Sequence, residues 1–193
     1  MGFSREFAGF TLIELIATMA VAAILATMSV GFISVIADNR RAAAISDVLS
    51  SVGFARFQAI SRGMPVTICR SADPLTTCGT GSGWESGWIV FSDPGNPGVI
   101  DSSETIISVH GPLSNGQTIR GTAAVAGVSA GTADRITFNP FGITMDGTTG
   151  NLLICDSRGI SKARSIVISA GGGMLSTDPA STVPASTSCP TPS

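Results

Sequence analysis

The sequence predicts an α+β protein, with one long N-terminal helix followed by an antiparallel β-domain. Residues 10–62 contain no proline and keep a helical hydrophobic pattern. From Pro65 onward, short β-rich runs alternate with Gly, Pro, Asn or Asp, and no helical period separates them. Because a helix followed only by strands does not make alternating βαβ units, this order favours antiparallel α+β packing.

The first half of the expected helix, residues 10–37, is apolar on all sides and follows a short polar leader, residues 1–9. A helix over this range would be about 42 Å long, whereas the hydrocarbon core of a bilayer is about 30 Å thick. The sequence therefore predicts a transmembrane or filament-core helix. Its one charge is Glu14, and a charge within a membrane segment is usually functional or paired.

The second half of the expected helix, residues 38–62, is amphipathic. Apolar residues recur there at spacings of three and four, as on one face of a helix. These residues are Ile45, Val48, Leu49, Val52, Ala55 and Ala59. We expect this half to pack under the β-domain.

The β-domain is expected over residues 63–175, and residues 176–193 form a tail rich in Ser, Thr, Ala and Pro. Each strand is predicted by a run of β-branched and apolar residues between turn residues. The runs cover residues 65–70, 88–91, 105–109, 117–119, 135–138, 152–155 and 165–169.

Four cysteines, Cys69, Cys78, Cys155 and Cys189, all follow the apolar segment, which fits an oxidising compartment. Four cysteines allow three connectivities. We favour Cys69–Cys78, which flanks a polar loop between strands, and this leaves Cys155 to pair with Cys189 and attach the tail to the sheet. The spacing lacks a Cys-x-x-Cys pair, so a zinc site is disfavoured.

Composition excludes several classes of function. At 193 residues the chain suits one domain plus an anchor, and a net charge of −2 gives no overall basic surface for nucleic acid. The one histidine, His110, has no nucleophile motif around it, and the chain contains no tyrosine. We therefore expect no enzyme, no catalytic residue, no cofactor and no metal.

Two loops have a superficial likeness to ligand sites. Oxygen ligands cluster between two strands, but their spacing departs from the EF-hand pattern and suits turns instead. These residues are Asp93, Asn96, Asp101 and Glu104. Glycines at positions 79, 81 and 83 suggest a phosphate loop, but Trp84 and a strand follow where a helix should begin.

Gly9, Phe10 and Glu14, between a short leader and an apolar helix, resemble the class III signal of type IV pilins and type II secretion pseudopilins. A secretory signal peptide differs, because its cleavage site follows the apolar stretch. The resemblance implies cleavage between Gly9 and Phe10 by prepilin peptidase and N-methylation of Phe10. It also implies that Glu14 pairs with the N-terminal amine of a neighbouring subunit during assembly.

Motifs in the β-domain resemble the GspH/FimT group of minor pilins and pseudopilins. They are Val66–Arg70, Gly87–Asp93, Asp101–Glu104, Ile136–Gly142 and Ile154–Gly159. The resemblance covers residues 9 to about 170 and implies two packed β-sheets against the long helix. It also implies a single-pass inner-membrane protein with a periplasmic C-terminal domain, which then joins a pilus or pseudopilus tip with other pilins.

The resemblance leaves three functions open. The first is a minor pilin in the initiation or tip complex of type IV pilus assembly, and the second is an H-type pseudopilin of a type II secretion system. The third is a DNA-binding minor pilin, with Arg158, Lys162 and Arg164 contacting phosphates. DNA-binding FimT proteins carry Gly-Arg-x-Arg after the last predicted strand. This chain has Gly172-Gly173-Met174-Leu175 there, which argues against DNA binding.

Overall fold

The computed structural model describes residues 9–72, 74–79, 83–95, 98–101, 104–113, 116–121, 134–145, 149–177 and Cys189, and only the backbone of residues 27–33. The predicted leader as far as Ala8 lies outside the described residues, as does most of the predicted tail. The chain divides into two compact units, Met1–Asn39 and Arg40–Ser193. Each unit is described by itself.

Helix α1, Leu12–Arg62, agrees with the helix expected over residues 10–62. It ends at Gly63, which has a φ of 65° and donates its N–H to the carbonyl of Ala59 at 3.1 Å. Glycine adopts this left-handed conformation without a Cβ clash, so it is a common residue after a helix end. Pro65 follows and cannot continue the helix.

In the first unit, the described apolar side chains of α1 are exposed. Leu12 is 79% exposed and Ile13 is 74% exposed, and residues as far along as Leu25 remain more than half exposed. Among the described residues, no helix is both long enough and apolar enough to cross a membrane. The membrane span expected over residues 10–37 therefore stays a prediction.

In the second unit, α1 buries one stripe of small and branched side chains, which confirms the amphipathic pattern. Val48, Val52, Ala55 and Ala59 are at most 1% exposed, while Ile45 and Leu49 are partly buried beside them. The stripe also includes Ala44, one turn before Val48. Small residues at three- and four-residue spacing let the helix axis approach the strands closely.

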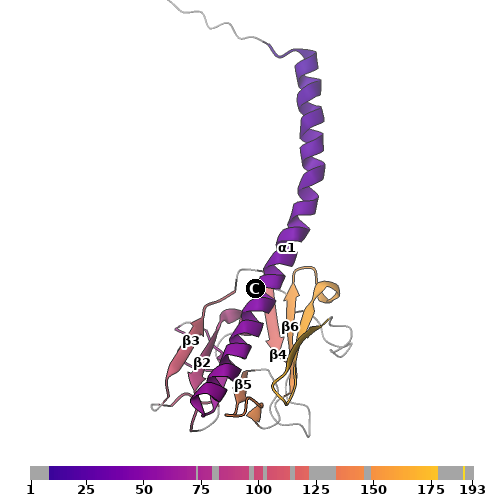
Figure 1. The fold of residues 1–193 in the computed structure, drawn as a ribbon. Helices are drawn as coiled ribbons and strands as arrows, with labels where there is room; N and C mark the ends of the chain where they lie inside the picture. Colours follow the sequence, from indigo (N-terminus) through magenta and orange to yellow (C-terminus); the bar gives the residue numbers. More distant parts are fainter. Residues whose placement is uncertain are drawn as a thin grey trace, which may run out of the picture. The chain divides into compact units, whose positions relative to one another are not determined.

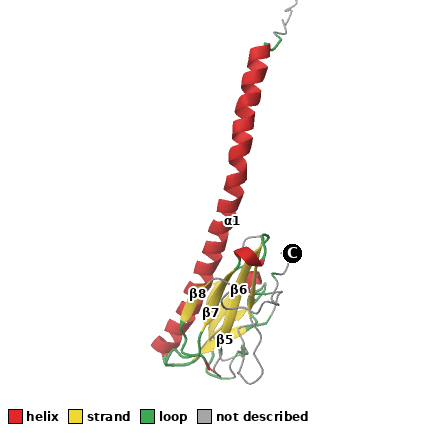
Figure 2. Cartoon of the chain, turned by 90° about the vertical axis from the view of Figure 1, so that its right-hand side faces the viewer, coloured by secondary structure: helices red, strands yellow, loops and turns green. Residues whose placement is uncertain are grey.

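The strands form two four-stranded antiparallel sheets, with orders β3-β2-β1-β5 and β4-β6-β7-β8. Figure 2 shows β8, β7 and β6 side by side, next to the second half of α1. The first sheet comprises β1 (Val66–Arg70), β2 (Trp88–Ser92), β3 (Ile106–His110) and β5 (Arg135–Phe138). The second comprises β4 (Gln117–Gly121), β6 (Gly150–Asp156), β7 (Arg164–Ile168) and β8 (Met174–Thr177).

Both sheets share one hydrophobic core with the second half of α1. In Figure 1 this half of the helix crosses the strands, with β2 and β3 on one side and β4 and β6 on the other. Alternate residues of each central strand enter the core, as the two-residue period of a strand requires. They include Val66 and Ile68 of β1, Trp88 and Val90 of β2, Leu152 and Ile154 of β6, and Ile166 and Ile168 of β7.

Strand β8 is not among the strands predicted from the sequence. Ser176 and Thr177, expected to begin the tail, belong to it. A tight turn joins it to β7, since Gly172, with a φ of 74°, donates its N–H to the carbonyl of Ser169 at 2.8 Å. A Cβ at Gly172 would lie 2.2 Å from the carbonyl oxygen of Gly142, so glycine is required there. The run Gly171–Gly173 is the sequence signal for this hairpin.

Candidate functional site

The N-terminus of α1 holds the residues of the predicted processing and assembly motif. The hydroxyl of Thr11 accepts a hydrogen bond from the backbone N–H of Glu14 at 3.3 Å, and the Thr11 carbonyl accepts from the same N–H at 3.1 Å. Thr11 therefore caps the helix and Glu14 lies in its first turn, where a carboxylate is stabilised by the helix dipole. Phe10 precedes the cap and is 83% exposed.

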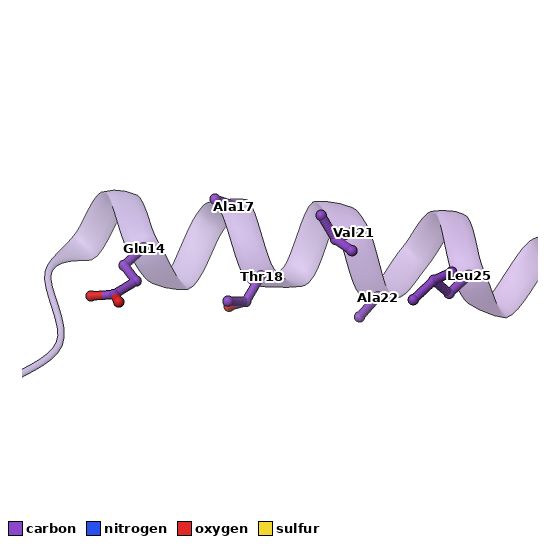
Figure 3. Close-up of a pocket in the computed structure, with 6 residues that line it drawn as sticks. All are labelled: Glu14, Ala17, Thr18, Val21, Ala22 and Leu25. Atoms are coloured by element: carbon purple, nitrogen blue, oxygen red, sulfur yellow. The ribbon is translucent and has the colours of Figure 1, made fainter.

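A shallow recess of about 390 Å³ runs from Glu14 along one side of this helix. Figure 3 shows its lining: Glu14, Ala17, Thr18, Val21, Ala22 and Leu25. Thr18 donates its hydroxyl to the carbonyl of Leu15 at 2.9 Å, so its polar group is satisfied within the helix. The carboxylate of Glu14 is thus the charged group on an otherwise apolar and small-residue surface.

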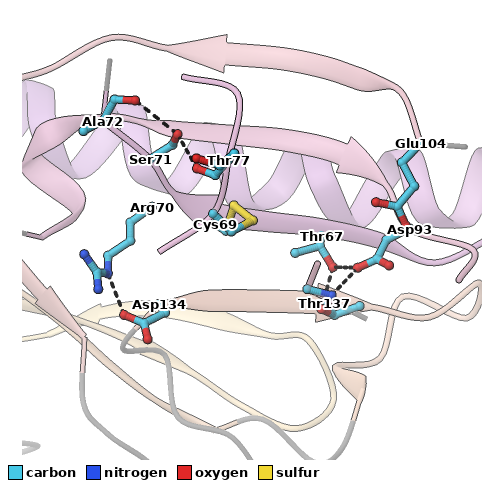
Figure 4. The surroundings of a disulfide bond; sticks show 12 residues. Thr67, Cys69, Arg70, Ser71, Ala72, Thr77, Asp93, Glu104, Asp134 and Thr137 are labelled. Carbon is cyan, nitrogen blue, oxygen red and sulfur yellow. Dashed lines mark hydrogen bonds and ion pairs between the residues drawn. A yellow bond between two sulfur atoms is a disulfide. The ribbon is translucent and has the colours of Figure 1, made fainter. Parts of the chain in front are cut away.

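Two disulfides join the four cysteines in the favoured pairing. Cys69 bonds to Cys78 with a Cα–Cα distance of 5.5 Å, and Cys155 bonds to Cys189 with a Cα–Cα distance of 5.8 Å. Figure 4 shows Cys69 in β1, next to Arg70, whose guanidinium contacts Asp134. No described cysteine is free.

The candidate DNA-binding residues lie around a buried carboxylate. Arg158 contacts Asp156 through a side-chain ion pair of 2.6 Å and through its backbone N–H at 2.9 Å. Arg41 of α1 also reaches Asp156, at 3.4 Å, and donates to the carbonyl of Lys162 at 2.5 Å. Arg164 lies in β7, opposite Ile154 of β6. The charge of Arg158 is therefore compensated within the protein.

The sequence analysis assigns no role to Arg41 or to Asp156, although Asp156 lies in the motif Ile154–Gly159. The side chain of Asp156 is 6% exposed and that of Arg41 is 11% exposed. Burial alone would raise the pKa of Asp156, but the hydrogen bonds from Arg158 and the charges of Arg158 and Arg41 lower it overall.

We expect Asp156→Asn to lower the free energy of unfolding by about 1–3 kcal/mol, because charge-assisted hydrogen bonds are lost at a buried position. A carboxyl group whose pKa is lowered in the folded state stabilises the fold above its ordinary value of 3.8, and this contribution is lost as the pH falls through the lower folded value. Urea unfolding between pH 7 and pH 2 measures both effects. The variant should lose stability less steeply in acid.

The same change at an exposed pair is the matched control. Asp134 contacts Arg70 at 2.5 Å, but the side chain of Asp134 is 55% exposed. Asp134→Asn should therefore change the unfolding free energy by less than about 1 kcal/mol, as for other surface ion pairs. Equal effects of the two substitutions would contradict the structural role of Asp156.

The acidic loop between β2 and β3 brings Asp101 and Glu104 near Gly95, two residues after Asp93, whereas Asn96 lies outside the described residues. A Cβ on Gly95 would lie 3.0 Å from a carboxylate oxygen of Asp101 and 3.8 Å from one of Glu104. Within the described ranges, no group of three or more His, Cys, Asp or Glu side chains is arranged to hold a metal ion. The loop is therefore not assigned to a cation.

The glycine-rich segment also lacks phosphate-loop geometry in its described part. Gly81 lies outside the described residues, and Gly83 is followed by a three-residue 3₁₀ helix, Trp84–Ser86, instead of the strand expected directly after it. The space beside Gly83 is filled by the side chains of Arg120 and Glu85, which form an ion pair. A phosphate would meet a carboxylate there.

His110 is held by structural contacts. Its ring stacks on Trp88 with centroids 3.9 Å apart, and its Nδ1 lies 2.8 Å from the carbonyl oxygen of Gly111. Its Nε2 lies 3.7 Å from a carboxylate oxygen of Asp47 of α1. The ring therefore links β3 to β2 and to the helix.

Comparisons with solved structures support the fold. The chain is similar to the type IV minor pilin FimU of Pseudomonas aeruginosa, strain PAO1, in two crystal forms. The P21 form matches with a TM-score of 0.54 and 17% identity, covering 79% of this chain and 95% of that chain. The P65 form matches with a TM-score of 0.50 and 15% identity, covering 77% and 97%. At these identities the likeness concerns the fold alone.

Comparisons of sequence identify the family. No curated protein sequence matches the chain. The family model described as prokaryotic N-terminal methylation motif matches residues 4–30, and the model described as type II transport protein GspH matches residues 44–172, more than half of the chain. The chain therefore belongs to the GspH family, a structural and non-enzymatic family of pilin-like proteins, and it carries an N-terminal methylation motif.

Proposed function

We propose that this protein is a minor pilin that takes part in type IV pilus assembly, in the initiation or tip complex. It is cleaved by prepilin peptidase after Gly9 and methylated on Phe10. It is held in the inner membrane by a single pass with its β-domain in the periplasm, and it then enters the filament. The observation that carries this proposal is the exposed apolar helix with Glu14 in its first turn, within the methylation motif.

The chemistry of Glu14 supports assembly through the helix. Its carboxylate lies on an exposed apolar surface, and such a surface is stabilised only when it leaves water. A carboxylate that leaves water with it needs a partner, because an unpaired buried charge costs several kcal/mol. The positively charged N-terminal amine of a neighbouring processed subunit has the required charge. Other minor and major pilins are therefore the proposed partners.

The second candidate is an H-type pseudopilin of a type II secretion system. The family model that matches residues 44–172 is described as type II transport protein GspH, which favours this reading. The two candidates use the same anchor, helix and β-domain and differ in the other subunits of the filament. DNA binding is not proposed, since the ion pairs of Arg158 with Asp156 compensate its charge.

Affinity capture of the full-length protein from membranes, followed by mass spectrometry, tests the proposal. We expect minor pilins and the major pilin among the captured proteins, and an N-terminal peptide that begins at methylated Phe10. Capture of secretion pseudopilins instead would favour the second candidate. An uncleaved Gly9–Phe10 bond would contradict both.

A further inference from the structure

The connection between β2 and β3 contains a fully buried carboxylate that is only half satisfied. Asp93 is 0% exposed. Its Oδ2 accepts hydrogen bonds from the hydroxyl of Thr67 and from the backbone N–H of Gly98, the latter at 2.6 Å. Its Oδ1 is buried and receives no donor from the described residues. A buried oxygen without a donor costs free energy, so the environment of Oδ1 requires an explanation.

Glu104, which lies just before β3, also has one carboxylate oxygen with a donor and one without. Its Oε2 accepts the backbone N–H of Asp101 at 3.1 Å, while its Oε1 is buried and receives no donor among the described groups. The negative charge of Asp93 lies close enough to raise the pKa of Glu104. Figure 4 shows the side chains of Glu104 and Asp93 next to each other, beside Thr67.

Two ionised carboxylates cannot hydrogen-bond, because both are acceptors only. A contact between them needs a proton, as in pairs of carboxyl groups that share a site. Asp93 is the better acceptor of the two, since its Oδ2 already receives two donors that stabilise its negative charge. We propose that Glu104 holds a proton on Oε1 and donates it to Oδ1 of Asp93. This hydrogen bond would make a pH-sensitive contact between the end of β2 and the start of β3.

The charges around the pair agree with this assignment. Burial raises the pKa of Glu104 above its ordinary value of 4.5, and Asp93 and Asp101 raise it further, against the backbone hydrogen bond from Asp101. From β1, the hydroxyl of Thr67 faces Asp93 and also bonds to Thr137 of β5. The side chain of Arg135 in β5 lies beside Gly98, whose N–H donates to Asp93.

The shared proton lies beside the end of the β2–β3 ladder. Ser92 donates its N–H to the carbonyl of Thr105 at 3.0 Å, and Thr105 donates its N–H to the hydroxyl of Ser92 at 3.1 Å. The ladder also shifts register between Val90 and Phe91. If Glu104 loses its proton, two carboxylates repel each other next to this irregular pairing. The start of β3 should then open more readily.

The direction of the pH effect follows from linkage. A carboxyl group with a raised pKa binds more proton in the folded state than in the unfolded state. Its stabilising contribution is full below 4.5 and is lost as the pH rises through the higher folded value. This direction is opposite to that of Asp156. Ionisation of Glu104 lowers the unfolding free energy as the pH rises, whereas protonation of Asp156 lowers it as the pH falls.

Carbon-13 NMR of the full-length protein with labelled glutamate carboxyl groups tests the proposal. The chain has four glutamates, Glu6, Glu14, Glu85 and Glu104, so Glu104→Gln assigns the signal. We expect the Glu104 signal to titrate at a pH above its ordinary value of 4.5. Asp93→Asn should move that midpoint down, and Asp101→Asn should move it less. A Glu104 midpoint at or below 4.5 would overturn the proposal.

The variant Glu104→Gln gives a second measurement that does not depend on the folding of Asp93→Asn. Its amide donates to Oδ1 of Asp93 at every pH, so the protection of the Thr105 amide, relative to the exchange rate of an unfolded chain at the same pH, should stay constant as the pH rises. In the wild type the protection of this amide should fall as Glu104 ionises. Equal pH dependence in both proteins would contradict a shared proton. A Glu104 signal that responds to added CaCl₂ and not to pH would replace the proton with a bound cation.

Discussion

Glu14→Ala is expected to leave cleavage after Gly9 intact and to reduce incorporation into filaments by about a hundredfold. Loss of one partner of a buried ion pair costs about 3 kcal/mol or more, and each 1.4 kcal/mol corresponds to a factor of ten. The helix start should persist, because Thr11 caps it through the backbone N–H of residue 14. Sheared filaments, probed for this subunit and compared with its level in membranes, give the measurement.

Two variants separate charge from shape. Glu14→Gln keeps the size of the side chain and removes its charge, so it should behave as Glu14→Ala does. Thr18→Ala removes a polar group one turn further on, but its hydroxyl bonds only to the carbonyl of Leu15 among the contacts described, so incorporation should remain normal. Normal incorporation of Glu14→Gln would show that a charge pair is not what recruits the subunit.

Local sequence patterns predict most of the fold. The helix over residues 10–62 follows from an unbroken apolar pattern without proline, and α1 covers Leu12–Arg62. The stripe through Val48, Val52 and Ala55 follows from spacings of three and four, and all three are buried. Both features depend on residues close in sequence, where periodicity carries the information.

Local periodicity does not predict which strands pair or which charged side chains meet. Which strands share a sheet depends on pairings between distant segments, such as β1 with β5. Asp156 and Arg41 are 115 positions apart, and no local pattern relates them. The strand β8 is short and follows three glycines, so the glycines indicate a turn while the strand after them gives a weak signal.

The pair of Asp93 and Glu104 is a second case in which local sequence patterns do not predict a contact. The sequence shows Asp93 and Glu104 as possible oxygen ligands in a loop whose spacing departs from the EF-hand pattern and suits turns instead. Whether they face water or each other depends on the burial of Asp93, which bonds to Thr67 of β1. Chemical type was therefore predictable, whereas protonation and contact required the folded chain.

Removal of the long disulfide, by Cys155→Ala together with Cys189→Ala, should give the largest loss of stability among the variants considered. The bond closes a loop with a sequence separation of 34 residues, which restrains the unfolded chain by about 3.8 kcal/mol on the loop-entropy model. Cys155 is 1% exposed and packs with Leu153 and Ala163, so its truncation adds a packing cost. We expect the melting temperature to fall by roughly 8–15 °C for a domain of this size.

The shorter disulfide is the matched control, because it also joins a buried strand residue to a partly buried partner. Cys69 bonds to Cys78 across 9 positions, for which the same model gives about 2.6 kcal/mol. Circular dichroism melts of both double variants, without reductant, compare the two bonds. The Cys155–Cys189 variant should melt at the lower temperature, and reductant should lower the melting temperature of each variant through its remaining bond. If loss of the longer bond left the melting temperature unchanged, attachment of Cys189 would not stabilise the second sheet.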